Sequence, residues 1–319
     1  SYMKGEVQFG DMAAFIMYLT MLTFPVSAIG WVASTIQRAA ASQKRLNEFL
    51  KTVTAIREPV NGITHNVQGA IEFRNVSFVY PHTGIEALKD FNLLIQKGEK
   101  IAVVGRTGSG KSTIAQLLLR FYDPSAGNIL IDGVPLNQLR LGAYRQQLSY
   151  VPQDVFLFSD TVANNIRFGD PEAKQEVVEE AAARAVVAAD VHRFSAGFQT
   201  MVGERGVTLS GGQKQRLTLA RAIMKNPALL ILDDCLNAVD ARTETAILTQ
   251  LTTYLQGRTA IIITHRIFSL LQFDRIVVMD EGRITEQGTH HELIAMNGLY
   301  AAMYRRQQRQ EQANDAVSK

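Results

Sequence analysis

The sequence contains only one cysteine, Cys235, in 319 residues. A single thiol cannot form an internal disulfide, and it cannot supply the cysteine clusters that bind structural zinc. Both kinds of stabilisation are therefore excluded within the chain. This shortage fits a protein whose main domain lies in a reducing compartment.

An excess of charge of either sign is also missing. The chain has 33 Lys and Arg against 30 Asp and Glu, which gives a formal net charge of +3. The basic residues are dispersed, without the Lys/Arg clusters that follow a phosphate backbone, so we expect no nucleic acid partner. With 46% hydrophobic and 20% charged residues, the chain has enough apolar side chains to bury a full core and is not disordered.

Charge is absent altogether between Asp11 and Arg38, over the 26 positions 12–37. A helix needs roughly 20 apolar residues to span a bilayer, and the core of a signal peptide is shorter, about 7 to 15 residues. A buried core helix is the alternative, but helices of globular proteins seldom stay uncharged for roughly seven turns. We therefore expect a membrane-spanning helix, kinked at Pro25, over about residues 12–37.

Basic residues follow this span at Arg38, Lys44 and Arg45. By the positive-inside rule, they place the rest of the chain in the cytoplasm. The membrane is then expected to be the inner (cytoplasmic) membrane. A single helix is an unusual anchor, and the sequence begins with Ser1 rather than Met. We therefore expect upstream membrane helices that this sequence lacks, in a multi-pass protein that contacts the lipid bilayer.

Composition changes mark the expected domains. A helical extension of the membrane helix is predicted to end near residue 56, and Pro, Gly and Asn at 57–68 indicate a linker. Beyond it, short strand-like runs such as "AIEFRNVSFVY", "KIAVVG" and "TAIIIT" alternate with helical stretches, which predicts an α/β domain with a largely parallel sheet over 69–309. Helix formers at about 155–226 predict an inserted helical subdomain, and 310–319 is a tail.

The strongest local signal is "VVGRTGSGKST", residues 103–113. It matches the P-loop pattern GxxxxGK(S/T), follows a predicted strand and precedes an apolar-striped helix. The glycines allow backbone N–H groups to turn toward a phosphate, while Lys111 is expected to reach the β- and γ-phosphates and Ser112 to bind Mg²⁺. The predicted ATP-binding residues here are Gly105, Arg106, Thr107, Gly108, Ser109, Gly110, Lys111, Ser112 and Thr113.

Two adjacent carboxylates follow the apolar run of "ALLILDDCLNAVD", residues 228–240. Alone, this pattern is also that of any buried parallel strand emerging into a loop. A P-loop protein, however, needs an acid at the tip of a neighbouring strand to hold Mg²⁺, and Asp233 is expected to be that acid. Asp234 points the other way by the period of two and is expected to face the water that attacks the γ-phosphate.

A second glycine motif, "LSGGQKQR" at 209–216, places two glycines after a serine at the start of a helix. Backbone N–H groups at a helix N-terminus make another phosphate site, which one chain does not obviously need beside its own P-loop. A glycine-rich helix cap is the ordinary alternative. It explains the glycines but not the neighbouring motifs.

Together these motifs resemble the nucleotide-binding domain of an ATP-binding cassette (ABC) transporter, preceded by the last membrane helix of an exporter half, and the match covers essentially the whole chain. The resemblance implies an ABC-type P-loop ATPase fold whose cofactors are ATP and Mg²⁺. It also implies a head-to-tail dimer in which each ATP lies between one P-loop and the partner's signature loop. The signature-loop residues are Ser210, Gly211, Gly212 and Gln213.

The resemblance assigns further roles one residue at a time. Tyr80 in "FVYP" would stack on adenine, and Gln153 in "VPQD" would bind Mg²⁺ and sense the membrane domain. His265 in "IITHR" would be the switch residue at the γ-phosphate. The turn Asn237–Asp240 would contact the partner, and Val202–Gly206 would couple to membrane helices. Singly, the first three have ordinary alternatives: an edge-strand aromatic, a solvated loop residue and a strand-end polar group.

Two departures from the family pattern stand out. The family usually has Glu at the position of Asp234 and Ser at that of Asn237. Asp is shorter than Glu by one methylene, roughly 1.5 Å, whereas a general base must lie within about 2.6 to 3.2 Å of the water it activates. The expected catalytic set is therefore complete in Lys111, Gln153 and His265 but altered at Asp234.

In exporters built from two different halves, one composite site commonly carries this substitution and turns over poorly. We therefore expect one half of a heterodimeric exporter, although the intact His265 leaves a slow homodimer open. A regulatory half that only binds ATP, or a soluble cassette ATPase acting on nucleic acid, are further alternatives, and the charge-free span argues against the last. The transported substrate stays open because its contacts lie in membrane helices.

Overall fold

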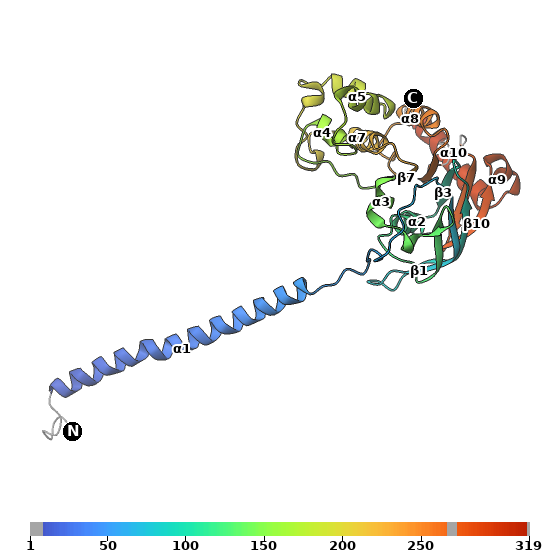
Figure 1. Ribbon diagram of the computed structural model, residues 1–319. Coiled ribbons are helices and arrows are strands. Elements are labelled where there is room, and N and C mark those ends of the chain that lie inside the picture. The colour runs from blue at the N-terminus through green and yellow to red at the C-terminus, as the bar shows by residue number, and fades with distance from the viewer. Residues whose placement is uncertain (1–8, 267–272, 318–319) are drawn as a thin grey trace. The chain divides into compact units, whose positions relative to one another are not determined.

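The computed structural model describes residues 9–266 and 273–317. The chain divides into two units, one ending at Ala55 and the other starting at Ile56. The first unit holds one helix, α1 (Phe9–Leu50), which is continuous through Pro25 and buries none of its residues (Figure 1). Its most apolar 18-residue stretch has a mean hydropathy of 1.8, so length and composition suit a membrane span. At 1.5 Å per residue α1 is about 63 Å long, roughly twice the hydrocarbon thickness.

The second unit contains a four-stranded antiparallel sheet of order β2-β1-β4-β5. Its strands are β1 (Ile71–Val79), β2 (Glu86–Ile95), β4 (Ala126–Ile131) and β5 (Val134–Pro135). The run "AIEFRNVSFVY", which contains β1, was expected in a largely parallel sheet. That expectation is wrong, because β1 pairs antiparallel with both β2 and β4. Buried residues along β1 are separated by partly or fully exposed ones, as in a strand with one covered face. Strands of a parallel sheet are instead covered on both faces.

The main sheet has six strands in the order β10-β9-β3-β8-β7-β6. It consists of β3 (Lys100–Gly105), β6 (Leu148–Val151), β7 (Leu229–Asp233), β8 (Thr259–Ile263), β9 (Arg275–Asp280) and β10 (Arg283–Gly288). Only β10 pairs antiparallel, so the expected α/β fold with a largely parallel sheet is confirmed. Every residue of β7 and β8 is buried, as expected for strands covered on both faces.

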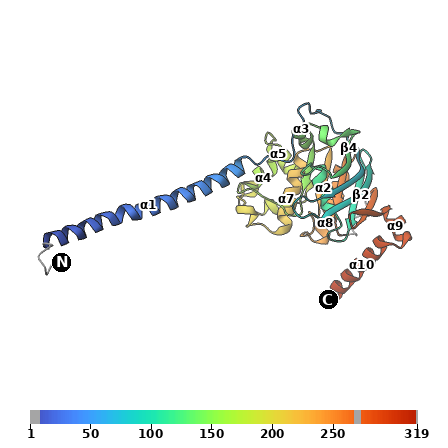
Figure 2. The ribbon, with the colours of Figure 1, turned by 90° about the horizontal axis from the view of Figure 1, so that it is seen from below.

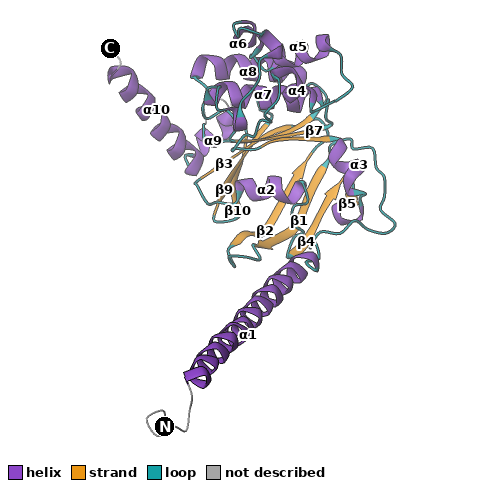
Figure 3. Cartoon of the chain, turned by 90° about the vertical axis from the view of Figure 1, so that its left-hand side faces the viewer, coloured by secondary structure: helices purple, strands orange, loops and turns teal. Residues whose placement is uncertain are grey.

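Helices cluster between β6 and β7 in the sequence, where a helical subdomain was expected. They are α4 (Val162–Arg167), α5 (Gln175–Arg184), α6 (Ala188–His192) and α7 (Gly211–Met224), and α3 (Leu141–Gln146) precedes β6. Figure 3 shows α4 to α7 gathered beyond one side of the main sheet. Their buried side chains, including Leu217, form one cluster with Leu230 of β7 and Ile262 of β8. The subdomain therefore shares its core with the sheet.

Two further layers cover the remaining surfaces of the main sheet. Helix α2 (Lys111–Leu118) packs in one apolar cluster with both sheets and lies between them in Figure 3. At the β9 side, α9 (His290–Met296) and α10 (Leu299–Val317) contribute Leu293 and Tyr300 to a cluster with β3 and β9. Beyond that contact α10 extends away from the sheet (Figure 2). The remaining helix, α8 (Ala241–Tyr254), packs in the cluster of the helical subdomain.

Thr259, the first residue of β8, connects the start of the second unit to the main sheet through hydrogen bonds. The fully buried hydroxyl accepts a hydrogen bond from the N–H of Gly98 at 2.9 Å and donates one to the carbonyl of Gly69 at 2.8 Å. Thr259→Val keeps the shape but leaves both backbone groups without this partner, so we expect a loss of about 1 to 3 kcal/mol in the free energy of unfolding. Denaturant unfolding of the full chain in detergent measures it. An equal effect from Thr253→Val, an exposed threonine of α8, would contradict this account.

Candidate nucleotide site

The P-loop joins β3 to α2 and depends on glycines at two close backbone contacts. Gly105 has φ 154°, and a Cβ there would lie 2.1 Å from the carbonyl oxygen of Met279. Gly110 has φ 95°, and a Cβ there would lie 2.4 Å from the carbonyl oxygen of Ala87. A larger residue at either position would therefore displace backbone. The loop leads directly into the N-terminus of α2, whose free N–H groups favour an anion.

Lys111, the first residue of α2, turns its amine into the loop. The Nζ atom donates hydrogen bonds to the carbonyls of Gly105 at 3.0 Å and Arg106 at 2.7 Å. Burial lowers the pKa of this ammonium, while the nearby carboxylates Asp233 and Asp234 act in the opposite direction. The Lys111 ammonium is thus held inside the loop by two backbone carbonyls and, at 3.4 Å, by the Ser109 hydroxyl.

Asp233, the last residue of β7, faces α2. Its Oδ1 accepts a hydrogen bond from the Ser112 hydroxyl at 3.1 Å, and its Oδ2 accepts one from the Tyr150 hydroxyl at 3.3 Å. Burial raises the pKa of the Asp233 carboxyl, although the two hydrogen bonds lower it. Sequence reasoning missed Tyr150. Its position at the end of β6, which pairs with β7, could have revealed it.

These groups fit Mg²⁺. The residues that the structure describes contain no cluster of three or more His, Cys, Asp or Glu side chains suited to a metal. Mg²⁺ in nucleotide sites is instead held by one or two carboxylates together with substrate phosphates. The hydroxyl of Ser112 and the carboxylate of Asp233 supply such oxygen donors beside the P-loop, and Gln153 lines the same cavity.

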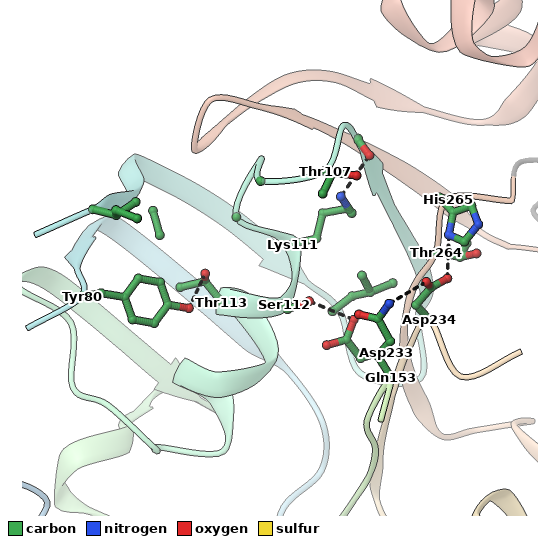
Figure 4. Close-up of a pocket in the computed structure, with 16 residues that line it drawn as sticks. Tyr80, Thr107, Lys111, Ser112, Thr113, Gln153, Asp233, Asp234, Thr264 and His265 are labelled. Carbon is green, nitrogen blue, oxygen red and sulfur yellow. Dashed lines mark hydrogen bonds and ion pairs between the residues drawn. The ribbon is translucent and has the colours of Figure 1, made fainter. Parts of the chain in front are cut away.

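Asp234 points to the other side of the strand end, toward His265. Its Oδ1 lies 2.8 Å from His265 Nδ1, and its Oδ2 lies 3.5 Å from Gln153 Nε2 (Figure 4). The backbone of Asp234 is left-handed, with φ 47°, and its N–H donates to the carbonyl of Ile263 at 2.8 Å. Asp234, predicted to face the attacking water, therefore lies together with His265, predicted at the γ-phosphate, and Gln153, predicted at Mg²⁺.

Tyr80 lies at the other end of the cavity in Figure 4. Its hydroxyl is hydrogen-bonded to Thr113 Oγ1 and to Gln116 Oε1, both at 2.9 Å, and its ring meets Phe78 and Tyr122 edge-on. These contacts hold the ring in place. They leave one aromatic surface lining the cavity, where an adenine is expected to stack.

Most of the predicted residues of this site border one cavity of about 370 Å³. The predicted site residues that line it are Tyr80, Gly105, Thr107, Gly108, Gly110, Lys111, Ser112, Thr113, Gln153, Asp233, Asp234 and His265. Arg106 and Ser109 do not: Arg106 is exposed, and Ser109 is buried beneath the loop. Ile85, Ala87, Ile263 and Thr264 also line the cavity but were not predicted, because apolar and small residues carry no chemical signal in a sequence.

The predicted signature loop, Ser210–Gln213, stands outside that lining. It begins α7 as a capping box, in which the Ser210 hydroxyl accepts from the N–H of Gln213 and the Gln213 side chain accepts from the N–H of Ser210. The first residues of α7 are thereby fixed. Gly211 and Gly212 both pack against Ala238.

The chain is similar to a known family and to several known proteins. Residues 88–237 match the family model described as ABC transporter. A probable multidrug resistance ABC transporter ATP-binding/permease protein, YheI, of Bacillus subtilis (strain 168) is 45% identical over 96% of the chain and 52% of its own length. An ATP-dependent lipid A-core flippase of Pseudomonas putida is 44% identical over 95% of the chain and 50% of its own length.

A solved structure of a bacterial Atm1-family ABC exporter with ATP bound is also similar, with a TM-score of 0.81 and 39% identity. The match covers 95% of this chain and 53% of that one. The chain thus spans about half the length of the relatives it matches.

Replacement of Lys111 tests the phosphate cradle. We expect Lys111→Ala to abolish measurable ATP binding at the chain's own P-loop, because no other described side chain supplies a cation at the loop's centre. Equilibrium binding of a fluorescent ATP analogue measures it. Lys225→Ala is the matched control, since its amine is also half-buried and donates to two carbonyls, those of Arg145 and Leu148. Unchanged affinity in Lys111→Ala would overturn the assignment.

Proposed function

Because the chain belongs to the ABC transporter family, we propose that it is the ATP-binding part of a half-transporter, which exports a substrate across the membrane. In this proposal, ATP-driven closure of two nucleotide-binding domains drives the export. The shared domain makes the second unit an ABC-type ATPase domain. The export role is supported by relatives whose names describe multidrug resistance and lipid A-core flipping, two chemically different substrates, and it leaves the substrate open.

One observation carries the proposal. The P-loop, both carboxylates and the switch histidine line a single cavity, whereas the signature loop of the same chain does not reach that lining. A second helix N-terminus that suits a phosphate but does not line the chain's own cavity would serve another nucleotide. The proposed partner is therefore a second ABC half-transporter, docked so that each signature loop completes the other chain's site.

The membrane part of the proposal rests on α1. Its large apolar side chains are exposed, among them Phe24 at 78% and Trp31 at 67%, and they need lipid or other membrane helices as neighbours. The name of one relative, an ATP-binding/permease protein, also supports a multi-pass membrane domain. We place that domain in the cytoplasmic membrane with the ATPase domain in the cytoplasm.

The proposal divides the steps of ATP binding and hydrolysis among the residues of the cavity. Lys111 would hold the phosphates, and Ser112 and Asp233 would hold a magnesium ion, which would neutralise charge on the phosphate oxygens. His265 orients the Asp234 carboxylate through the 2.8 Å contact, and Asp234 takes the proton from the attacking water. In this proposal, ATP binding and Mg²⁺ binding therefore use groups other than Asp234, which sets the rate of hydrolysis.

We further propose that this chain's own site hydrolyses ATP slowly and that its partner is a different half with a competent site. The Asp234 carboxylate sits close to the strand end and is already engaged by His265, so it reaches less far toward the phosphates than a glutamate would. A slow homodimer, or a regulatory half that only binds ATP, would share this geometry. Turnover at the chain's own site distinguishes these alternatives.

The signature loop provides a test across the dimer. We expect Gly211→Asp to abolish hydrolysis at the partner's site and to spare ATP binding at the chain's own P-loop, because the carboxylate would meet the partner's γ-phosphate. ATPase activity of the assembled pair measures it. Gly211→Ala is the control for crowding, since its Cβ would also lie 3.2 Å from the Cβ of Ala238 but adds no charge. Full activity of the assembled pair with Gly211→Asp would refute the composite site.

Lengthening Asp234 tests the weak base. General-base assistance is worth about 10² to 10⁴ in rate, so we expect Asp234→Glu to raise turnover at the chain's own site without tightening ATP binding. Asp234→Asn, which keeps the shape and removes the base, should lower the activity of the assembled transporter only modestly. Single-turnover hydrolysis, with the partner's site disabled, compares the three. Fast hydrolysis by the native chain that Asp234→Asn abolishes would instead favour the homodimer.

A further inference from the structure

The turn after β7, Asn237–Asp240, is held from one side by helix α7. Gln215 of α7 donates from Nε2 to the Oδ1 of Asn237 at 2.5 Å and accepts from the N–H of Ala238 at 3.1 Å. Its side chain is only 4% exposed, so both ends of the amide are committed to the turn. The residue that departs from the family's usual serine, Asn237, is the one that Gln215 binds.

Arg266 holds the same turn from the other side. This residue directly follows the switch histidine, and its guanidinium donates to the backbone carbonyls of Asn237 at 2.8 Å and Val239 at 3.1 Å. It also forms an ion pair with Glu244 of α8 at 2.5 Å, in which the side chains are 29% and 10% exposed. A planar fork of donors suits such a multiple contact, and a lysine could not reproduce all of it.

Close packing completes the connection. A Cβ at Gly211 would lie 3.2 Å from the Cβ of Ala238, and one at Gly212 would lie 3.1 Å from the carbonyl oxygen of Ala238. The start of α7, the turn and the segment after β8 are therefore in direct contact. Densely packed groups do not move independently, so a displacement of one is passed to the next.

We propose that Arg266 and Gln215 are positioning residues that couple the two ATP sites of the dimer. A movement of His265 at the chain's own nucleotide shifts Arg266, the turn and Gln215 together, and with them the start of α7 that faces the partner's nucleotide. Neither residue borders the nucleotide cavity, so neither acts on ATP directly. The inference rests on the proposed function, because only a head-to-tail dimer gives α7 a second nucleotide to contact.

The first test measures the connection within one chain. Hydrogen exchange of the amides at 209–216 is recorded with and without Mg-ATP, in detergent, at a dilution where the chain is monomeric. We expect ATP at the P-loop to change this exchange by about fivefold, the lower end of usual coupling between sites. Arg266→Gln should remove the response at an unchanged Kd for ATP, and Arg266→Lys should restore part of it.

Arg275→Gln is the matched control. Arg275 pairs with Glu99 at 2.8 Å with side chains 24% and 14% exposed, and it lies opposite Ile101, at the end of the sheet away from the P-loop. This variant should respond to ATP as the parent does. A parent that binds ATP without any change at 209–216, or an Arg266→Gln variant that keeps the response, would overturn the inference alone. A parent that does not bind ATP would overturn the proposed function as well.

The second test is a double-mutant cycle in the assembled transporter. We expect Arg266→Gln and Gln215→Leu each to lower kcat about tenfold with little change in KM, and the double variant to lower it about tenfold rather than a hundredfold, because residues acting through one turn are not additive. Thermal unfolding of each variant accompanies the kinetics. Additive losses of kcat would show that the two residues play a structural role only. So would a loss of kcat that follows the loss of thermal stability equally closely in the control variant Arg275→Gln.

Discussion

The register of three parallel strands is the constraint on which the nucleotide site depends. Val103 of β3 pairs with Ile263 of β8, and Ile263 pairs with Asp233 of β7. The P-loop, the two carboxylates and His265 each lie at or just beyond the end of one of these strands, so they meet at one edge of the sheet. A slip of one residue would exchange the two faces of a strand and turn Asp233 away from Ser112. Burial of both faces of β7 and β8 makes such a slip costly.

Much of this edge was predictable because the chemistry is local in sequence. A P-loop, an acidic pair after an apolar run and a histidine after another apolar run each predict the end of a strand. Parallel strands bring their carboxyl ends together. The sequence also indicated one long apolar helix and the block of helices between β6 and β7. The expected domain bounds remain predictions, although the two units meet between Ala55 and Ile56.

What escaped prediction depends on contacts between residues far apart in the chain. The antiparallel pairing of β1 is set by its partners β2 and β4, which the pattern of β1 alone does not identify. Tyr150 reaches Asp233 across 83 positions, and Arg266 reaches Asn237 across 29. Hydroxyl and guanidinium groups are common on surfaces, so their role emerges only when the fold supplies an acceptor.

Binding and hydrolysis rest on different parts of this architecture. Lys111, Ser112 and Asp233 lie within α2 and β7, whose apolar side chains form one continuous core, so their positions are as stable as the domain itself. Asp234 lies one residue past the last strand pair, with a left-handed backbone that Asp adopts more readily than most residues. In the proposed mechanism, a change of its side chain therefore leaves the sheet and the phosphate cradle in place and alters only the distance to the attacking water. Selection on such a domain has freedom to weaken turnover at one site while preserving ATP-dependent closure, which is the requirement for a dimer with unequal halves.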